Sequence, residues 1–141
     1  MNETLNGKLK FGSTVIYIKD NIKETLDFYS RAFGFNVRYY DDNLRFGELE
    51  LNETTIMIAS YAAGEFMVGS SFREWLSDKP NNVEIAFITD NVAGAYSKAI
   101  AAGAKKALEP KTFPWGQEAA YVYIIEGTLI GILTPAPVAD K

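Results

Sequence analysis

Hydrophobic and polar positions along the chain predict the same order of secondary-structure elements twice. In the first half, short runs of β-branched and aromatic residues predict strands. Apolar residues at helical spacing from Ile22 to Phe33 predict one helix, which Gly34 ends. This half is therefore expected to be β-α-β-β-β, with a strand at 13–19, the helix at 22–33, and strands at 35–40, 44–51 and 54–60.

The second half is expected to repeat this order. A helix at 92–102 is predicted from the spacing of its apolar residues and ends at Gly103. The surrounding strands are predicted at 83–89, 104–108, 119–125 and 128–134. Pro110 to Gln117 is expected to form a loop, and Glu126-Gly127 a tight turn.

A weak internal repeat supports the duplication. At an offset of 70, Ile18 matches Ile88, and Asp20-Asn21 match Asp90-Asn91. We therefore predict an α+β fold of two βαβββ modules, whose mixed sheets curl into incomplete barrels flanked by helices. The predicted divisions are an N-terminal segment at 1–12, a first module at 13–60, a connecting segment at 61–81, a second module at 82–135 and a C-terminal tail at 136–141.

The connecting segment is more apolar than a free linker would be. Phe66, Met67, Phe72 and Trp75 lie within it. It is expected to fold onto another part of the protein, as a lid or a dimer contact. The alternative is a satellite hydrophobic cluster under a long loop.

Composition excludes several classes of site. Of 141 residues, 48% are hydrophobic, which suffices for a core, and the net charge of −4 makes nucleic acid an unfavourable partner. The absence of His and Cys rules out a Ser-His-Asp triad, a cysteine nucleophile, disulfides and any zinc site built from His or thiolates. A metal would have to be held by oxygen ligands alone.

No export or membrane signal is expected from the sequence. The start, 1–10, is polar, and no run approaches the roughly 20 apolar residues of a membrane span. We therefore expect a cytoplasmic protein without membrane association.

Several local motifs stand at corresponding places in the two halves and in the loop of the second half. They are Leu26-Asp27-Phe28-Tyr29 with Ala32-Phe33-Gly34-Phe35, Asn91-Val92 to Tyr96, Ala101-Ala102-Gly103-Ala104, and Pro114-Trp115-Gly116-Gln117. Together they resemble the vicinal oxygen chelate superfamily, which holds glyoxalase I, bleomycin-resistance proteins, fosfomycin-resistance enzymes and extradiol dioxygenases. The resemblance implies paired modules that supply strands to a cupped sheet, with the ligand on its concave face.

The resemblance also implies four metal-ligand positions, two in each module. They fall on Thr14, near Ile58, on Glu84 and on Gly131. Only Glu84 is a good ligand, whereas sites built from oxygen ligands gather about six donors. We therefore expect no metal and no cofactor, which argues against metal-dependent glyoxalase, dioxygenase or thiol-transferase activity.

Glu84 is the candidate catalytic residue. Alternation along 83–88 places it on the face opposite to Ile85 and Phe87. If those two residues pack under the helices, Glu84 points into the cup. There it could bind a cationic or hydrogen-bonding group, or act as a general base. The alternative is a solvated or salt-bridged strand residue.

Further candidates for ligand binding are aromatic and polar side chains on the predicted strands and in the 110–117 loop. Trp115 offers a flat apolar surface and is expected to line the same cavity as Glu84, unless it merely anchors its own loop. The strand aromatics could stack on a planar ligand, or belong to the core or a dimer interface. The full set of ligand-binding candidates is Thr14, Tyr39, Phe46, Glu84, Trp115, Gln117, Tyr121 and Tyr123.

Arg38 and Arg45 are predicted to face each other across the turn at 41–43. As a pair they could grip a carboxylate or phosphate group. Solvation at the surface is the alternative.

Two functional hypotheses follow. The first is a metal-independent binding protein of the bleomycin-resistance kind, which holds a small planar or cationic molecule in an aromatic, acid-lined cleft. The second is a glyoxalase-like lyase that uses Glu84 as acid or base. A dimeric scaffold without a small-molecule role is a third possibility. Because each module leaves its concave sheet uncovered, we expect a homodimer.

Overall fold

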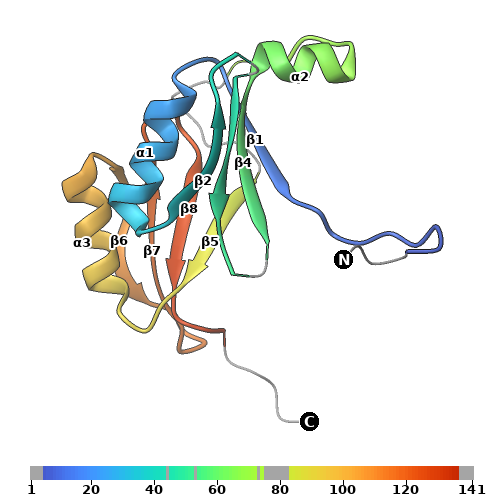
Figure 1. Ribbon diagram of the computed structural model, residues 1–141. Helices are drawn as coiled ribbons and strands as arrows, with labels where there is room; N and C mark the ends of the chain where they lie inside the picture. The colour runs from blue at the N-terminus through green and yellow to red at the C-terminus, as the bar shows by residue number, and fades with distance from the viewer. Residues whose placement is uncertain (1–4, 44, 53, 73, 75–82, 137–141) are drawn as a thin grey trace.

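The computed structural model describes residues 5–43, 45–52, 54–72, 74 and 83–136, and it confirms the predicted order of elements. The first module contains β1 (Thr14–Ile18), α1 (Ile22–Phe33), β2 (Asn36–Asp41), β3 (Phe46–Glu50) and β4 (Thr55–Ser60). The second contains β5 (Glu84–Ile88), α3 (Val92–Ala102), β6 (Lys105–Thr112), β7 (Glu118–Tyr123) and β8 (Leu129–Leu133). A further helix, α2 (Tyr61–Val68), follows β4 directly (Figure 1).

Each module forms its own four-stranded mixed sheet, so the fold is α+β. The strand order is β1-β4-β3-β2 in the first sheet and β5-β8-β7-β6 in the second. β1 runs parallel to β4, and β5 runs parallel to β8, whereas the other neighbours are antiparallel. Among the described residues neither sheet closes on itself, because the first and second strands of each module stay at the two edges.

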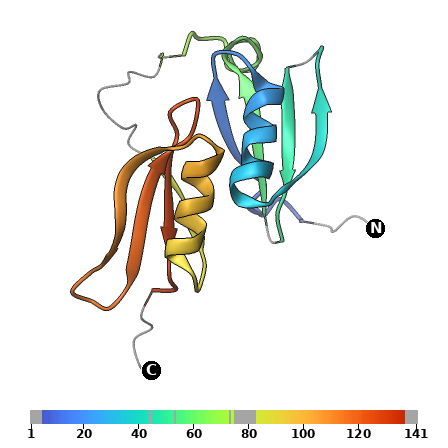
Figure 2. The same ribbon diagram turned by 90° about the vertical axis from the view of Figure 1, so that its left-hand side faces the viewer.

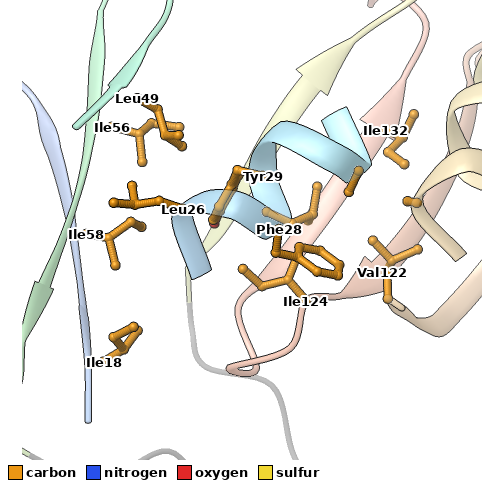
Figure 3. Close-up of a cluster of buried hydrophobic side chains, with 14 of the residues drawn as sticks. Ile18, Leu26, Phe28, Tyr29, Leu49, Ile56, Ile58, Val122, Ile124 and Ile132 are labelled. Atoms are coloured by element: carbon orange, nitrogen blue, oxygen red, sulfur yellow. The ribbon is translucent and has the colours of Figure 1, made fainter. Parts of the chain in front are cut away.

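The helices join the two modules into one hydrophobic core. α1 packs on the first sheet, α3 packs on the second sheet, and the two helices contact each other (Figure 2). In Figure 3, Leu26 of α1 lies beside Ile56 and Ile58 of the first sheet, whereas Phe28 lies beside Ile124 of the second module. We call the side of each sheet that packs on its helix the helix face, and the other side the open face.

Alternation determines which residues of the two parallel strands reach the open face. In β5, Ile85 and Phe87 pack against the core, and Glu84, which alternates with them, is exposed on the other face. In β1, Ile16 and Ile18 pack inward, so Val15 and Tyr17 lie on the open face.

This pattern corrects the alignment of the internal repeat at the first strand. Ile18 is 2% exposed, whereas Ile88, its match at an offset of 70, is 58% exposed. The structural partner of Ile18 is therefore Phe87, at an offset of 69. Three residues separate Ile18 from α1, whereas four separate Phe87 from α3. The shorter connection contains Asn21 at a φ of 65°, a left-handed conformation that Asn tolerates better than most residues.

The loop predicted at 110–117 is shorter than expected, because β6 continues to Thr112. The strand carries Pro110 within it, and its pairing with β7 is irregular on either side of Leu108. β6 is an edge strand, where a sheet tolerates a residue that cannot donate a backbone hydrogen bond. The remaining loop covers 113–117.

The connecting segment is partly helical. The Ser60 side chain caps α2 by accepting a hydrogen bond from the first turn of the helix (3.0 Å). Gly64 of α2 lies against the rings of Tyr17 and Phe72, which contact each other edge to face at 4.5 Å. Trp75 lies outside the described residues. In the described part of the chain, none of the helices has the length and apolar character needed to cross a membrane.

Candidate functional site

A cavity of about 700 Å³ lies on the open face of the first sheet. Side chains from β1, β3 and β4 form its floor, and α2 forms one wall. Its volume falls within the range of roughly 300–1,000 Å³ that is typical of small-molecule sites. We call it the first-sheet cavity; its lining residues are Val15, Tyr17, Asn43, Arg45, Phe46, Met57, Ala59, Ser60, Ala62, Ala63, Phe66 and Met67.

Strand pairing brings the floor residues together. Val15 of β1 is paired with Met57 of β4, and Tyr17 is paired with Ala59. Phe46 of β3 is paired with Ala59 from the other side. Paired residues point to the same side of a sheet. The floor is therefore a continuous apolar surface with an aromatic ring on either side of Ala59.

The mouth of the cavity is also apolar. Phe66 and Met67 of α2 line the cavity but remain 88% and 78% exposed. Because Gly64 has no side chain, α2 can approach the ring of Tyr17 closely. Large exposed apolar side chains around a cavity are typical of a binding surface.

The first-sheet cavity coincides with two of the four implied metal positions. The pairing of Val15 with Met57 in the first sheet corresponds to that of Glu84 with Leu129 in the second. By the same correspondence, Ala59 takes the place of Gly131. The implied metal position in the first strand is therefore Val15 rather than Thr14. Thr14 lies on the helix face, as Ile16 and Ile18 do, so the structure does not bring it together with the residues of the open face.

These positions do not provide a metal-binding donor set. Val15, Ala59 and Gly131 have no side-chain oxygen, which leaves Glu84 as the only donor among the four. Within the described ranges, no group of three or more carboxylates is arranged to hold a metal ion.

Glu84 lies on the open face of the second sheet and is exposed. Its carboxylate lies over Gly131. A Cβ atom added at Gly131 would collide with this carboxylate and would lie 3.0 Å from the ring of Tyr121. Glycine at 131 therefore makes room for the Glu84 side chain. Burial, and then the negative charge of Glu84, raise the pKa of Tyr121. Glu84 and Tyr121 are thus close neighbours on this face.

Trp115 and Gln117 lie at the tip of the β6–β7 hairpin. The Trp115 indole N–H donates to Gln117 Oε1 (3.0 Å), and its ring stacks on Phe113 at 5.0 Å. The Gln117 amide donates in turn to the backbone carbonyl of Thr134 (2.8 Å). Both polar groups therefore help to hold the hairpin tip in place, while Trp115 stays 59% exposed.

The structure does not bring Trp115 together with Glu84. Glu84 is paired with Leu129, whereas the hairpin tip lies beside Thr134, just beyond the other end of β8. Five residue steps separate Leu129 from Thr134, or roughly 16 Å at about 3.3 Å per residue. Neither Trp115 nor Glu84 lines the first-sheet cavity.

The four strand aromatics divide between the two open faces. Phe46 lines the first-sheet cavity, and Tyr39 packs against it with ring centroids 5.5 Å apart. Tyr121 and Tyr123 alternate along β7 on the face that carries Glu84, and both are half-buried. The predicted candidates thus form two groups rather than one cluster.

Arg38 and Arg45 do not face each other, so that prediction is wrong. Arg38 donates to Glu48 (3.0 Å) and to the Thr55 hydroxyl (2.7 Å), beside the far end of the β2–β3 hairpin. Arg45 lies at the turn end of the same hairpin, with a φ of 56°, and lines the first-sheet cavity. A ligand in this cavity would therefore meet one arginine and not a pair.

Four floor residues do not stand out in the sequence as site candidates: Val15, Tyr17, Met57 and Ala59. All four lie in strands that are apolar on both faces, so a search for polar or acidic candidates passes over them. The available signal was the alternation of Ile16 and Ile18 with Val15 and Tyr17, once the helix face of β1 is identified.

A second cavity, of about 380 Å³, lies where the modules meet, between β1 and the β7–β8 turn. Glu126 in that turn is half-buried, and its Oε1 atom is shielded from solvent. Burial raises the pKa of its carboxyl group, while hydrogen bonds with Thr128 lower it. Glu126 Oε1 and the buried Tyr29 hydroxyl lack hydrogen-bond partners among the described residues. Burial is the main cause that raises the pKa of the Tyr29 hydroxyl, and the negative charge of Glu126 raises it further. The junction thus contains a carboxyl group that ionises only at a cost.

Comparison with protein-family models identifies a superfamily for this chain. The model of the Glyoxalase/Bleomycin resistance protein/Dioxygenase superfamily matches residues 10–128. A search of curated proteins finds no match.

Several solved structures share this fold. A glyoxalase-related enzyme from Fulvimarina pelagi is similar at 17% identity, over 86% of each chain, with a TM-score of 0.74. A hypothetical protein from S. aureus is 19% identical, over 92% of this chain and 97% of that one, with a TM-score of 0.74. A family enzyme from Burkholderia phytofirmans is 21% identical, over 87% and 96%, with a TM-score of 0.67. At these identities the likeness is one of fold.

Proposed function

The chain belongs to the Glyoxalase/Bleomycin resistance protein/Dioxygenase superfamily, and from that premise we propose that it binds a small planar organic molecule without a metal. The proposed site is the first-sheet cavity. The observation that carries the proposal is the chemistry at the two metal positions of this sheet. Val15 and Ala59 line a cavity of about 700 Å³ and offer a ligand apolar contact instead of metal donors.

The lining of the cavity indicates the kind of molecule. Tyr17 and Phe46 can contact the faces or edges of a flat ring. Arg45 is the charged residue of the lining. We therefore expect a neutral or anionic planar molecule here, whereas the cationic molecule expected from the sequence would need Glu84 on the other sheet.

Titration with anilinonaphthalene sulfonate, a planar anionic fluorophore, tests the proposal. Val15→Glu places a carboxylate in the floor of the cavity and should weaken binding by about tenfold or more, because the charge resists desolvation and repels the sulfonate. Val37→Glu is the matched control, since Val15 and Val37 are both 36% exposed but Val37 lies on β2 outside the cavity lining. Equal affinities for both variants would refute the site.

A second candidate function is a lyase reaction in which Glu84 acts as acid or base. The observation that favours it is the exposed Glu84 carboxylate beside Tyr121 on an open face. Glu84→Gln would then abolish turnover of a glyoxalase substrate while leaving fluorophore binding in the first-sheet cavity unchanged. If no turnover is detected in the unaltered protein, this candidate is rejected.

A homodimer is part of the proposed function. Its support is the pair of unclosed sheets and the exposed apolar side chains of Phe66 and Met67. Sedimentation at micromolar concentration should show a species of twice the chain mass of 15.7 kDa. A single 15.7 kDa species would contradict the dimer.

A further inference from the structure

A further cavity, of about 500 Å³, lies between α1 and the turn that joins β2 to β3. We call it the α1 cavity. Ile18, the last residue of β1, is paired with Ser60, the last residue of β4, so α1 and α2 both begin at this end of the first sheet (Figure 1). The α1 cavity and the first-sheet cavity share Arg45 and Ser60 in their linings. The two cavities are therefore neighbours, with Arg45 at their boundary.

The backbone of Arg45 is held firmly at this boundary. Its N–H donates to the Asp41 carbonyl (2.9 Å), and its carbonyl accepts from the Ser60 N–H (3.0 Å). Its φ of 56° lies in the left-handed region, which is uncommon for a residue as large as arginine. Strained conformations of this kind persist where the surrounding structure fixes them, and they gather at functional sites. The turn thus fixes the point from which the Arg45 side chain extends.

The Arg45 side chain is exposed and available to a ligand. Among the described residues, no ion pair or side-chain hydrogen bond engages its guanidinium group. The nearby Asp42 carboxylate accepts a hydrogen bond from the Tyr40 hydroxyl instead (2.7 Å). By contrast, Arg38 is paired with Glu48 at 3.0 Å. Arg45 therefore presents a positive charge at the rim of an otherwise uncharged, largely apolar cavity.

The charges around the α1 cavity limit the kind of anion that Arg45 can bind. One arginine matches one carboxylate, which it can hold through two parallel hydrogen bonds. A second negative charge on the ligand would face an excess of acidic over basic side chains beyond Arg45. The charged residues that line the α1 cavity are acidic at Asp20, Glu24, Asp27 and Asp42, and basic at Lys23, Arg31 and Arg45.

We propose that the first-sheet cavity binds a planar aromatic acid, whose ring lies on the floor between Tyr17 and Phe46 and whose single carboxylate is held by Arg45. This inference rests on the proposed function, because it takes the first-sheet cavity as the site of a planar ligand. The ring gains apolar and aromatic contact from the floor. The carboxylate lies at the α2 end of the cavity, where Arg45 is. Arg45 thus selects an acid over a neutral or cationic molecule of the same shape.

Equilibrium dialysis with naphthoate and naphthalenemethanol tests this selection, because the two molecules share a ring system and differ in charge. The unaltered protein should bind naphthoate about tenfold or more tightly than naphthalenemethanol. Arg45→Gln should remove this preference by weakening the binding of naphthoate alone. Glutamine meets the same backbone strain as arginine at this φ, so the turn should keep its shape. Arg38→Gln is the matched control, since it removes an equal charge outside the cavity lining and should leave both affinities unchanged.

Two further measurements examine the charge itself. Arg45→Lys should keep part of the preference for naphthoate, because it keeps the positive charge but loses the paired hydrogen bonds. Naphthyl phosphate carries close to two negative charges and should bind more weakly than naphthoate. Tighter binding of the phosphate than of naphthoate would overturn the assignment of a single carboxylate.

The outcomes separate this inference from the proposed function. Equal binding of naphthoate and naphthalenemethanol by the unaltered protein would overturn the role of Arg45 and leave the proposed function standing. So would an equal loss of both affinities in Arg45→Gln, or a loss of the preference in Arg38→Gln. Binding of neither molecule would reject the proposed function and this inference with it.

Discussion

The substitution Gly64→Ala tests how closely α2 packs on the first sheet. A methyl group at this position would lie 2.6 Å from two ring atoms of Phe72 and 2.7 Å from a ring atom of Tyr17. Ordinary contacts begin at about 3.4 Å. Either α2 must move away from β1 by several tenths of an ångström, or the two rings must rotate.

Two opposing effects set the change in stability. Alanine is favoured over glycine inside a helix by about 1 kcal/mol. Overpacking against a fixed neighbour costs about 1–3 kcal/mol. We therefore expect Gly64→Ala to lower the free energy of unfolding by about 0–2 kcal/mol. Because Tyr17 and α2 both line the first-sheet cavity, the affinity for anilinonaphthalene sulfonate should fall by about threefold or more.

Urea unfolding and fluorophore titration measure both effects, and Gly94→Ala in α3 is the matched control. The three atoms nearest to a methyl group there belong to the Asn91 side chain, at 2.5–3.1 Å. Asn91 caps α3 by accepting a hydrogen bond from the Gly94 N–H (3.0 Å). Loss of that cap and the gain in helix propensity are each worth about 1 kcal/mol, so the control should change little. If Gly64→Ala were as stable as the unaltered protein and bound the fluorophore equally well, the packing of α2 described above would be refuted.

Three further predictions concern the core, the module junction and the metal positions. Leu26→Ala should lower the free energy of unfolding by about 2–5 kcal/mol in urea, because Leu26 is fully buried against the first sheet; a loss below about 1 kcal/mol would contradict this packing. Burial raises the pKa of Glu126 in the folded state, so the folded protein binds this proton more tightly than the unfolded chain does. The stability that this group contributes is therefore present below its unfolded pKa and is lost as the pH rises through its raised folded pKa. In urea unfolding, the free energy of unfolding of Glu126→Gln should therefore rise relative to that of the unaltered protein as the pH increases through this range. A difference between the two proteins that stays constant with pH would count against the burial of Glu126. Elemental analysis of protein purified without chelator should find less than one transition metal per chain, since Glu84 is the lone donor at the four positions, whereas one metal per chain would show that the donor set has been misassigned.

The order of elements was predictable because the two periodicities are clear and glycines end both long helices. Ile22, Leu26 and Tyr29 recur at helical spacing and are buried, and Gly34 and Gly103 adopt positive φ values where the helices stop. α2 was not predicted, because it is apolar on nearly all sides and lacks the polar face that marks an amphipathic helix.

The site was less predictable than the fold. Val15 and Tyr17 alternate with Ile16 and Ile18, and apolar residues on both faces of a strand do not reveal which face is covered by a helix. The one-residue difference between the two strand-to-helix connections then moved the expected metal position from Val15 to Thr14. Only the packing of the helices resolves both points.

The most direct test of the account is a crystal structure of the protein with anilinonaphthalene sulfonate bound. The account predicts the fluorophore in the first-sheet cavity, in contact with Val15, Met57 and Phe46, and without a metal ion beside it. Fluorophore bound only on the open face of the second sheet, beside Glu84, or bound through a metal ion, would contradict it.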